Sequence, residues 1–415
     1  MMTVMAILLH TILWAGLIPL IAATLYLMLL SIAAVLNPAR AQIRGEFDGP
    51  REPGSRLLLL IPAHDEELVI EAVLRKLKEQ SYPQSHYEVV VVADNCSDRT
   101  AEIARAQGAC VLERSDEHNR GKGQALNWVM REHLAKWPRP YDGVVVMDAD
   151  SFLNRDFLWF MDAELRAGHE LLQAYYGVLN PLDNWRTSLA AAALAVFHFL
   201  RPLGRSLLGF SCGLKGNGMA FSRRLVEEYG YPAFSVVEDL ELALFYLERD
   251  ILVRFVPGAH ALGQMAASSR DAGTQRARWE GGRLALVRKW AFPLLVRAFK
   301  RRRPALFDGA MELLIPPFGM LVALTVGWLF LALAAVPATG GVVSYRPSCA
   351  AAGVLGLQAI YTLLGLILAR VPLTVYRRLL LAPAFIGWKL ATYLSMARSR
   401  RGQSDGEWVR TGRQR

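Results

Sequence analysis

An apolar stretch over residues 4–36 constrains the fold of this chain more than any other feature of its sequence. Apart from His10 and a few hydroxyl-bearing residues, its side chains are nonpolar. Since about 20 helical residues cross a bilayer core, the stretch is too long for one upright span and too short for two spans with a turn. It is also too long for a cleaved signal peptide, and no basic segment precedes it. We therefore expect one long or tilted transmembrane helix within residues 1–40.

Two more apolar runs, at 310–336 and 351–369, predict two transmembrane helices within residues 307–372. Pro316-Pro317 should kink the first helix or delay its start. Basic residues lie at 40–56, 300–303 and 370–378, whereas the 338–350 loop holds only Arg346. By the positive-inside rule, the middle of the chain and its C-terminus are predicted to be cytoplasmic. These features are typical of an integral protein of the bacterial inner membrane.

Two amphipathic segments are predicted to lie on the membrane surface. Residues 286–306 mix leucines and Trp290 with arginines and lysines, and residues 373–415 combine an apolar segment at 379–396 with a basic tail. A fourth full span over 379–396 would place that tail outside, against the charge rule. We expect an interfacial helix in each region, with Trp388 and Tyr393 at headgroup depth in the second. The alternative is an ordinary amphipathic helix packed on the soluble domain.

Composition supports a membrane protein and disfavours several other classes. Hydrophobic residues make up 53% of the chain, above the usual soluble range, and the net charge is +10. A basic protein can bind nucleic acid or an anionic lipid surface, but no base-reading motif accompanies the basic clusters. We therefore expect membrane lipids, and no nucleic acid, as partners. The four cysteines show no paired spacing, so neither a zinc site nor a disulfide framework is indicated.

Between the apolar ends, residues 50–285 are predicted to form an α/β domain with a mostly parallel sheet. Short apolar runs at 57–61, 89–93, 110–113 and 144–147 alternate with helical patterns at 67–79, 99–107 and 124–134. Ligands bind such sheets at the carboxyl ends of the strands. The alternative is that the polar residues at the strand ends are only turn and cap residues. That explanation is weaker for three strands together than for one. The three strand ends with polar candidates are Pro62-Ala63-His64-Asp65-Glu66, Asp94 and Asp148-Ala149-Asp150.

Paired carboxylates suit the transfer of a sugar from a metal-bound nucleotide diphosphate. Asp148 and Asp150 lie on one side of an extended segment, and their hard oxygen ligands suit Mg²⁺ or Mn²⁺. Such an ion neutralises the charge that builds on a diphosphate leaving group. Glu238 and Asp239 open a predicted helix and offer a carboxylate base for an acceptor hydroxyl. A stabilising charge at the helix N-terminus is the alternative for this pair.

Two further segments are candidates for the same site. In Gln275-Arg276-Ala277-Arg278-Trp279, the planar guanidinium of Arg278 could donate hydrogen bonds to a diphosphate, and the Trp279 ring could stack on a sugar. The alternative is that this segment is simply a basic amphipathic helix. The Gly213–Gly218 segment suggests close backbone approach to a ligand, or a plain loop. Arg120-Gly121-Lys122-Gly123 is not a P-loop, and no G-x-G-x-x-G follows the first strand, so an ATPase or a dehydrogenase is disfavoured.

Taken together, these motifs resemble the membrane-integrated family-2 glycosyltransferases with a GT-A fold, the group that contains cellulose, hyaluronan and poly-N-acetylglucosamine synthases. The resemblance runs from about Leu57 to Arg283, with matching hydrophobic flanks. It implies an inverting, nucleotide-sugar-dependent hexosyltransferase that uses Mg²⁺ or Mn²⁺ and forms β-linkages from a UDP-sugar.

The resemblance also implies a role for each position. Asp65, Asp94 and Lys122 would contact the nucleotide, and Asp239 would be the general base beside Glu238. The other implied roles are donor binding by Pro62, Ala63 and Glu66, diphosphate binding by Asp148, metal binding by Asp148 and Asp150, and contacts with the acceptor or diphosphate by Gln275, Arg278, Trp279 and Asn217.

Departures from the family pattern leave the product open. Val237 stands where these synthases often carry threonine, and Gly216-Asn217-Gly218 replaces the Phe-Cys-Gly element of cellulose synthases. Three readable spans are fewer than in most polymer-extruding members, so interfacial helices, a homo-oligomer or an export partner would complete a channel. We expect extension of an exopolysaccharide. The alternatives are a single transfer to a lipid, as in ceramide glucosyltransferases, and a non-catalytic sugar-nucleotide-binding membrane module.

Overall fold

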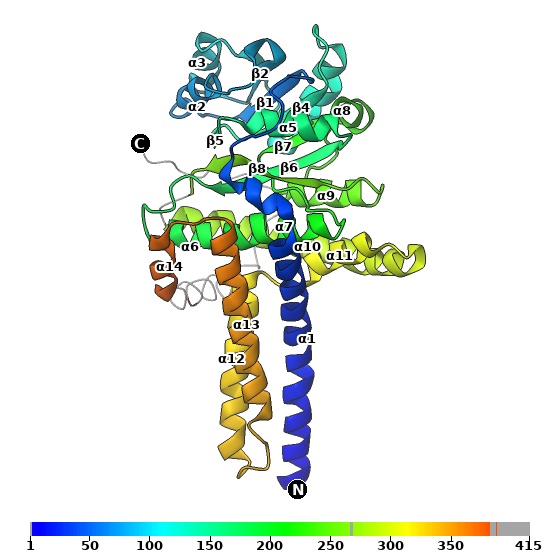
Figure 1. Ribbon diagram of the computed structural model, residues 1–415, viewed down its shortest axis with the longest axis vertical. Helices are drawn as coiled ribbons and strands as arrows, with labels where there is room; N and C mark the ends of the chain where they lie inside the picture. Colours follow the sequence, from blue (N-terminus) through cyan, green and yellow to red (C-terminus); the bar gives the residue numbers. More distant parts are fainter. Residues whose placement is uncertain (1, 266–268, 382–386, 388–415) are drawn as a thin grey trace.

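The structure is a computed structural model that describes residues 2–265, 269–381 and 387, with the side chains of residues 2, 3 and 269–280 outside that description. Figure 1 shows an α/β domain above a bundle of long apolar helices that run alongside one another. Shorter helices lie across the junction between these two parts. The molecule is therefore organised as a sheet-based upper part, a layer of helices beneath it, and a bundle of apolar helices.

One eight-stranded sheet forms the centre of the upper part. In space the strands follow the order β3-β2-β1-β4-β7-β6-β8-β5. The β3–β2, β2–β1, β1–β4 and β6–β8 pairs are parallel, whereas β7 is antiparallel to β4 and β6, and β5 to β8. The predicted α/β class with a mostly parallel sheet is thus confirmed. The strands are β1 (Leu57–Ala63), β2 (Tyr87–Asp94), β3 (Cys110–Arg114), β4 (Gly143–Val146), β5 (Ser151–Leu153), β6 (Leu171–Val178), β7 (Met219–Ser222) and β8 (Arg254–Gly263).

Continuous apolar runs explain why the first strands are central and parallel. All residues of β4 are buried, and so are all residues of β1 except Pro62. Strands buried on both faces need helices on both sides. Those packed around this sheet are α2 (Ile70–Leu77), α3 (Thr100–Ala106), α4 (Lys122–Trp128), α5 (Phe157–Arg166), α8 (Arg223–Tyr229) and α9 (Glu238–Leu247).

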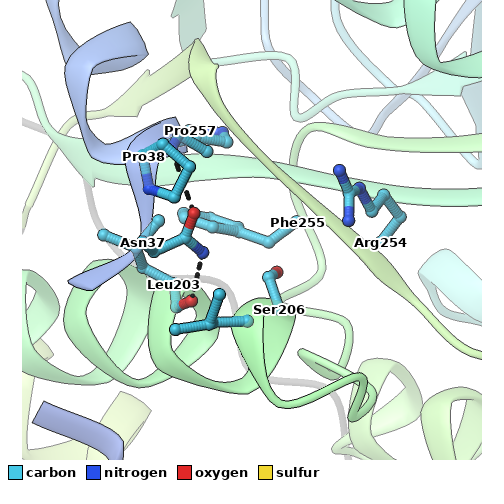
Figure 2. Close-up of a pocket in the computed structure, with 9 residues that line it drawn as sticks. Asn37, Pro38, Leu203, Ser206, Arg254, Phe255 and Pro257 are labelled. Carbon is cyan, nitrogen blue, oxygen red and sulfur yellow. Dashed lines mark hydrogen bonds between the residues drawn. The ribbon is translucent and has the colours of Figure 1, made fainter. Parts of the chain in front are cut away.

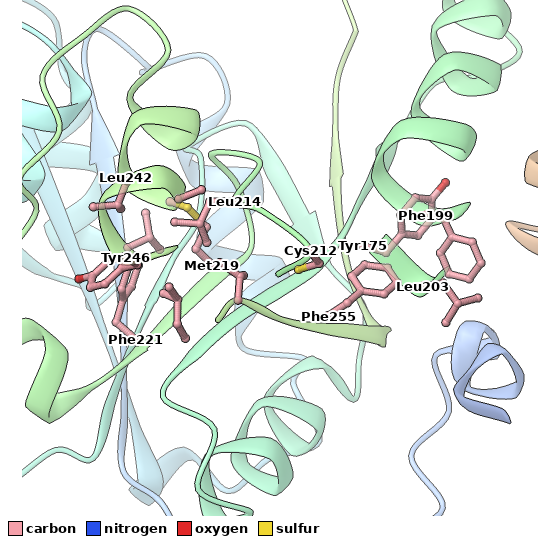
Figure 3. Close-up of a cluster of buried hydrophobic side chains, with 14 of the residues drawn as sticks. Tyr175, Phe199, Leu203, Cys212, Leu214, Met219, Phe221, Leu242, Tyr246 and Phe255 are labelled. Atoms are coloured by element: carbon pink, nitrogen blue, oxygen red, sulfur yellow. The ribbon is translucent and has the colours of Figure 1, made fainter. Parts of the chain in front are cut away.

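A hydrophobic core joins the sheet to the helices below it (Figure 3). Phe199 and Leu203 come from a helix beneath the sheet, and Tyr175 and Phe255 come from β6 and β8. Phe199 packs edge-on against both aromatic rings, with centroids 5.1 and 5.7 Å apart. The sheet and the helix layer therefore share one core.

The junction layer contains a helix that sequence analysis did not identify. It covers residues 185–207 and consists of α6 (Trp185–Leu194), a π-helical turn η5 (Ala195–Leu200) and α7 (Arg201–Leu207). Arg201 and Arg205 interrupt its apolar pattern, which is why sequence reasoning passed over it. Figure 1 shows α6, α7 and α11 (Pro304–Leu314) lying across the upper ends of the long helices.

Within the described residues, four helices are long and apolar enough to cross a membrane, at residues 4–36, 185–207, 318–338 and 346–368. The long helices are α1 (Met2–Leu36), α12 (Phe318–Ala338) and α13 (Arg346–Leu368). The apolar stretch at the N-terminus forms one helix, as predicted. Pro316-Pro317 separates α11 from α12, so the proline pair delays the start of the second apolar helix as expected.

The structure describes most of the first predicted interfacial segment and only the start of the second. Residues 286–306 belong mostly to α10 (Ser269–Arg301), which begins well before the predicted segment. After α13 the chain forms α14 (Leu373–Arg378) and a short turn over Leu379–Leu381. The rest of the predicted helix at 379–396 lies outside the described residues, apart from residue 387.

Candidate active site

A buried asparagine holds the Asp148-Ala149-Asp150 turn at the carboxyl end of β4. Asn217 is fully buried, at 0% exposure. Its Oδ1 accepts a hydrogen bond from the Asp148 backbone N–H at 3.2 Å, and its Nδ2 donates to Ser151 Oγ at 2.7 Å. The Ser151 hydroxyl donates in turn to Asp150 Oδ1 at 3.3 Å. Asn217 thereby fixes both carboxylate-bearing residues relative to the sheet.

Lys122, the first residue of α4, joins this turn to loop 208–218 between α7 and β7. Its ammonium donates to Asp148 Oδ1 and to the carbonyl oxygen of Gly216. Burial by itself lowers the pKa of Lys122, but the charges of Asp148 and Glu238 outweigh it and raise that pKa above its ordinary value. Lys122 is therefore a cation at neutral pH and links two separate segments of the site.

Glu238 and Asp239 open α9, as the sequence predicted. Loop 208–218 passes close to them: Gly216 has a φ of +77°, and a Cβ there would lie 3.5 Å from Asp239 Oδ2. Burial and then the charge of Asp239 raise the pKa of Glu238 to about 7, and burial raises the pKa of Asp239 as well. A carboxylate with a raised pKa can accept a proton near neutral pH.

A second polar group lies at the carboxyl ends of β1 and β2. Asp94 and Arg114 form a buried ion pair, with Nη1 2.6 Å from Oδ1. His64 Nδ1 lies 2.7 Å from the Asp94 carbonyl oxygen. Asp65 has a φ of +53° and accepts a hydrogen bond from the Ser97 N–H at 2.7 Å. The other predicted donor-site residues, Pro62, Ala63 and Glu66, lie at the end of β1 and in the turn after it. Because β2, β1 and β4 are neighbours in the sheet, both polar groups share one edge.

Two sets of side chains offer possible ligands for a metal ion. Among the described residues, Asp65, Cys96 and Asp98 bring three possible ligand atoms within 4.8 Å of one another. Burial raises the pKa of Cys96 to about 11, so its thiol is protonated and a poor ligand. Asp148, which pairs with Lys122, and Asp150 supply two carboxylates from one turn, and such hard oxygen atoms fit Mg²⁺ or Mn²⁺ better.

A buried ion-pair network connects loop 208–218 with the junction helices. Arg205 is 1% exposed. Its Nε lies 3.0 Å from Asp308 Oδ1, and its Nη2 lies 2.6 Å from Glu312 Oε2. Arg201 and Lys215 also approach Glu312, at 3.7 and 3.8 Å. Burial alone raises the pKa of Glu312, but these three cations lower it well below its ordinary value. The network therefore contains an ionised carboxylate on α11.

Two tyrosines extend this network to the long helices. Tyr26 of α1 donates its hydroxyl hydrogen to Asp308 Oδ1. Arg201 Nε donates to the Tyr361 hydroxyl of α13 at 2.6 Å. One set of charged side chains consequently ties α1, α7, α11 and α13 to the loop that contacts Asp239.

A cavity of about 170 Å³ lies where the end of α1 meets α7 and the start of β8 (Figure 2). Two of its polar side chains are engaged by the protein: Asn37 Nδ2 donates to the Leu203 carbonyl oxygen at 2.8 Å, and Arg254 pairs with Glu164 at 3.2 Å. The Ser206 hydroxyl, also in the lining, has no hydrogen-bond partner among the described residues. None of the predicted site residues lines it. We place no substrate in this cavity.

The structure groups most, though not all, of the predicted site residues. Lys122, Asp148, Glu238 and Asp239 lie around Gly216, and the Asp65 and Asp94 group shares their sheet edge. Because Asn217 is buried and bonded at both polar side-chain atoms, we assign it a positioning role instead of the ligand contact expected from sequence. Gln275, Arg278 and Trp279 lie on α10, but their side chains are outside the described part of the chain, so their role stays a prediction.

Sequence reasoning missed two buried cations. Arg114 ends β3 and pairs with Asp94, and Lys215 stands inside the glycine-rich Gly213–Gly218 segment. A charged residue at the end of an apolar strand, or between closely spaced glycines, was the only signal available for either.

The chain is similar to known proteins in sequence and in structure. Residues 53–282, more than half of the chain, match the family model described as "Glycosyltransferase like family 2". The chain is 26% identical over 263 residues to the probable glycosyltransferase YdaM of Bacillus subtilis (strain 168), covering 61% of this chain and 60% of that protein. It is 29% identical over 255 residues to the beta-monoglucosyldiacylglycerol synthase of Trichormus variabilis, covering 59% of this chain and 52% of that protein. The matched parts thus span less than two thirds of these relatives.

Among solved structures, the mannosyltransferase PcManGT from Pyrobaculum calidifontis, in complex with GDP-Man and Mn²⁺, has a TM-score of 0.48 and 20% identity, covering 86% of this chain and 98% of that one. Glucosyl-3-phosphoglycerate synthase from Mycobacterium tuberculosis has a TM-score of 0.36 and 22% identity, covering 54% of this chain and 76% of that one. We assign no ligand from these similarities. The match over residues 53–282 and the α/β sheet with its carboxylate edge agree, and the chain belongs to glycosyltransferase family 2, with a GT-A-like fold.

Proposed function

We propose that this protein is an inverting, metal-dependent glycosyltransferase that transfers a hexose from a UDP-sugar to the hydroxyl group of a membrane lipid. In this proposal α1, α12 and α13 cross the membrane, the helix 185–207 and α11 lie at its surface, and the catalytic part is cytoplasmic. The basic residues beside the long helices support that orientation by the positive-inside rule.

The observation that carries the proposal is the double attachment of loop 208–218. On one side, Gly216 lies against Asp239 and accepts a hydrogen bond from Lys122. On the other side, Lys215 approaches Glu312 of α11, which ends just before the apolar helix α12. The candidate base is therefore next to the helices that would lie at the lipid surface, where a lipid hydroxyl is accessible.

A lipid acceptor is better supported than the exopolysaccharide expected from sequence. Three relatives, 28–29% identical to this chain over 208–255 residues, are named beta-monoglucosyldiacylglycerol synthase. A single transfer also requires no channel for a polymer. The helices α1 and α13, tied to α11 and α7 by the Tyr26 and Tyr361 contacts, suit an anchor for the catalytic part.

The chemistry follows from the positions of the side chains. Asp239 would take the proton of the acceptor hydroxyl as its oxygen attacks the anomeric carbon, and burial raises the pKa of Asp239 and of Glu238 beside it. Lys122 would hold Asp148 in place and stabilise negative charge on the diphosphate. Asn217 would keep the turn that carries Asp148 and Asp150 rigid.

A divalent ion held by Asp148 and Asp150 would supply further charge neutralisation at the leaving diphosphate. The donor-side group of Asp65 and Asp94 lies on the same sheet edge, where a nucleotide would bind. Arg114 fixes the orientation of the Asp94 carboxylate, so both residues are expected to affect the Michaelis constant for the donor.

The decisive experiment is transfer by the purified protein in detergent. A panel of radiolabelled UDP-sugars is incubated with diacylglycerol, with ceramide or with a β-linked oligosaccharide, each with Mn²⁺ or with EDTA. We expect one organic-extractable glycolipid, formed only with the metal and lost in Asp239→Asn. A high-molecular-weight product in the aqueous phase would instead restore the polysaccharide hypothesis, and the absence of transfer in every combination would contradict both.

A further inference from the structure

The ammonium group of Lys215 is buried near the candidate base and has hydrogen-bond donors to spare. Its side chain is 7% exposed, and in the described part of the chain its Nζ makes no hydrogen bond. Glu312 Oε1 lies 3.8 Å from Nζ, while Arg205 already holds Oε2 of this carboxylate at 2.6 Å. An ammonium carries three donors. Lys215 can therefore donate a hydrogen bond to an oxygen atom of a bound molecule.

Phe197 covers Lys215 and comes from a distorted turn of the junction helix. The ring centroid lies 4.1 Å from Lys215 Nζ. Phe197 belongs to the π-helical turn Ala195–Leu200, a distortion frequently found at functional positions. Its side chain remains 37% exposed, whereas the next residue, His198, is buried and stacks on Tyr176 with centroids 5.3 Å apart. The π-helical turn thus combines an anchored imidazole with an accessible apolar ring.

The chemistry of Asp239 indicates the kind of molecule that would use this pair. A neutral alcohol must lose its proton as it attacks, which requires a base, whereas a phosphate oxygen is already anionic and requires none. Gly216, next to Lys215, lies against Asp239, so both groups can act on one acceptor. A diacylglycerol offers a hydroxyl for the base, ester carbonyl oxygens for an ammonium and acyl chains for a ring.

We propose that Lys215 and Phe197 form the acceptor subsite, in which the Lys215 ammonium donates to an ester carbonyl oxygen of a neutral diacylglycerol and the Phe197 ring packs against its acyl chain. This inference rests on the proposed lipid glycosyltransferase function and adds the part of the acceptor that is recognised. Lys215 and Phe197, which lie outside the carboxylate motifs, would thus select the lipid.

The test measures the Michaelis constant for dioleoylglycerol in mixed micelles and, separately, that for UDP-glucose. The variants are Phe197→Ala and Lys215→Gln. Phe307→Ala is the matched control, because Phe307 is 41% exposed and lies on the junction helix α11 without a contact to Lys215 among the described residues. Since losing one hydrogen bond or part of a ring contact costs up to about tenfold in binding, we expect an increase of about 10-fold in the constant for dioleoylglycerol in both variants.

Both variants should keep the constant for UDP-glucose within twofold of the wild type, and Phe307→Ala should change neither constant. An increase in the constant for UDP-glucose would assign Lys215 to the donor and overturn the subsite. An equal effect of Phe197→Ala and Phe307→Ala would also overturn it. If the wild type glucosylates no diacylglycerol although its metal and donor are present, the proposed function itself fails, a result distinct from the other two.

Discussion

Replacing Asn217 with alanine would separate the positioning role that we assign to it from direct contact with a ligand. The side chain is fully buried and bridges the Asp148 backbone and the Ser151 hydroxyl. Alanine removes both bonds and leaves one backbone N–H without its acceptor. The Asp148-Ala149-Asp150 turn would then be free to adopt other conformations.

The magnitude follows from these two hydrogen bonds. Each contributes about 0.5–1.5 kcal/mol, and the orphaned N–H adds a desolvation cost of about 1–3 kcal/mol, so the folded site should be destabilised by about 2–6 kcal/mol. Part of this free-energy cost will lower global stability, and part will weaken metal binding. Residues that orient metal ligands typically change metal affinity by about 10–100-fold when they are replaced. We expect the Mn²⁺ concentration for half-maximal activity to increase within that range.

The assay is a Mn²⁺ titration of initial rates at saturating donor and acceptor, with thermal unfolding measured in parallel. Asn37→Ala is the control, because Asn37 is also buried and makes two side-chain hydrogen bonds, to the Leu203 carbonyl and the Ala39 N–H. It should lose stability but keep the Mn²⁺ dependence of the wild type. Ser151→Ala should give a smaller shift than Asn217→Ala, since it removes the bridge to Asp150 but not the bond to the Asp148 backbone.

An unchanged Mn²⁺ titration in Asn217→Ala, together with a large increase in the Michaelis constant for the acceptor, would refute this reasoning. Asn217 would then act on the acceptor, as the family resemblance originally suggested. Equal shifts in Asn217→Ala and Asn37→Ala would show that general destabilisation explains the effect.

Three other predictions test the site and its anchor. Because burial raises the pKa of Asp239 above its ordinary value, kcat/KM should increase with pH over a range above that of an ordinary aspartate; a pH profile that is flat from 5 to 8 would contradict a base with a raised pKa. Arg205→Met leaves Asp308 without its cation and removes the nearest of the three cations around Glu312, so it should cost about 3–5 kcal/mol, measured as loss of thermal stability in detergent, whereas an unchanged melting temperature would show that the network is dispensable. Gly204→Ala should destabilise the protein by about 1–3 kcal/mol in the same assay, because a Cβ there would lie 2.1 Å from the Leu30 carbonyl oxygen; wild-type stability would mean that α1 can move away from α7.

Sequence reasoning succeeded where a local pattern carries the physical cause. The alternation of apolar runs and helical spacing predicted the parallel strands β1 to β4, because strands buried on both faces need continuous apolar sequence. Pro316-Pro317 predicted the break before α12, because proline cannot be accommodated within a helix without losing a backbone hydrogen bond. The opening of α9 at Glu238 was predicted for a similarly local reason.

The role of Asn217 and the ion pairs of Arg205 could not be predicted in this way. Asn217 acts on Ser151, which is 66 positions away in the chain, and Arg205 pairs with Asp308, 103 positions away. The helix 185–207 also escaped notice, since its arginines look like surface residues until α11 supplies their carboxylates. Such partners become visible only when distant segments are packed together.

The sequence by itself determined the α/β class, the long apolar helices and the carboxylates that mark the family, because each depends on residues close together in the chain. Only the tertiary structure decided which side chains share a site and what joins that site to the long apolar helices. The reason is physical: a buried charge or amide must find its partners in space, and here the partners of Lys122, Asn217 and Arg205 come from other elements of the fold.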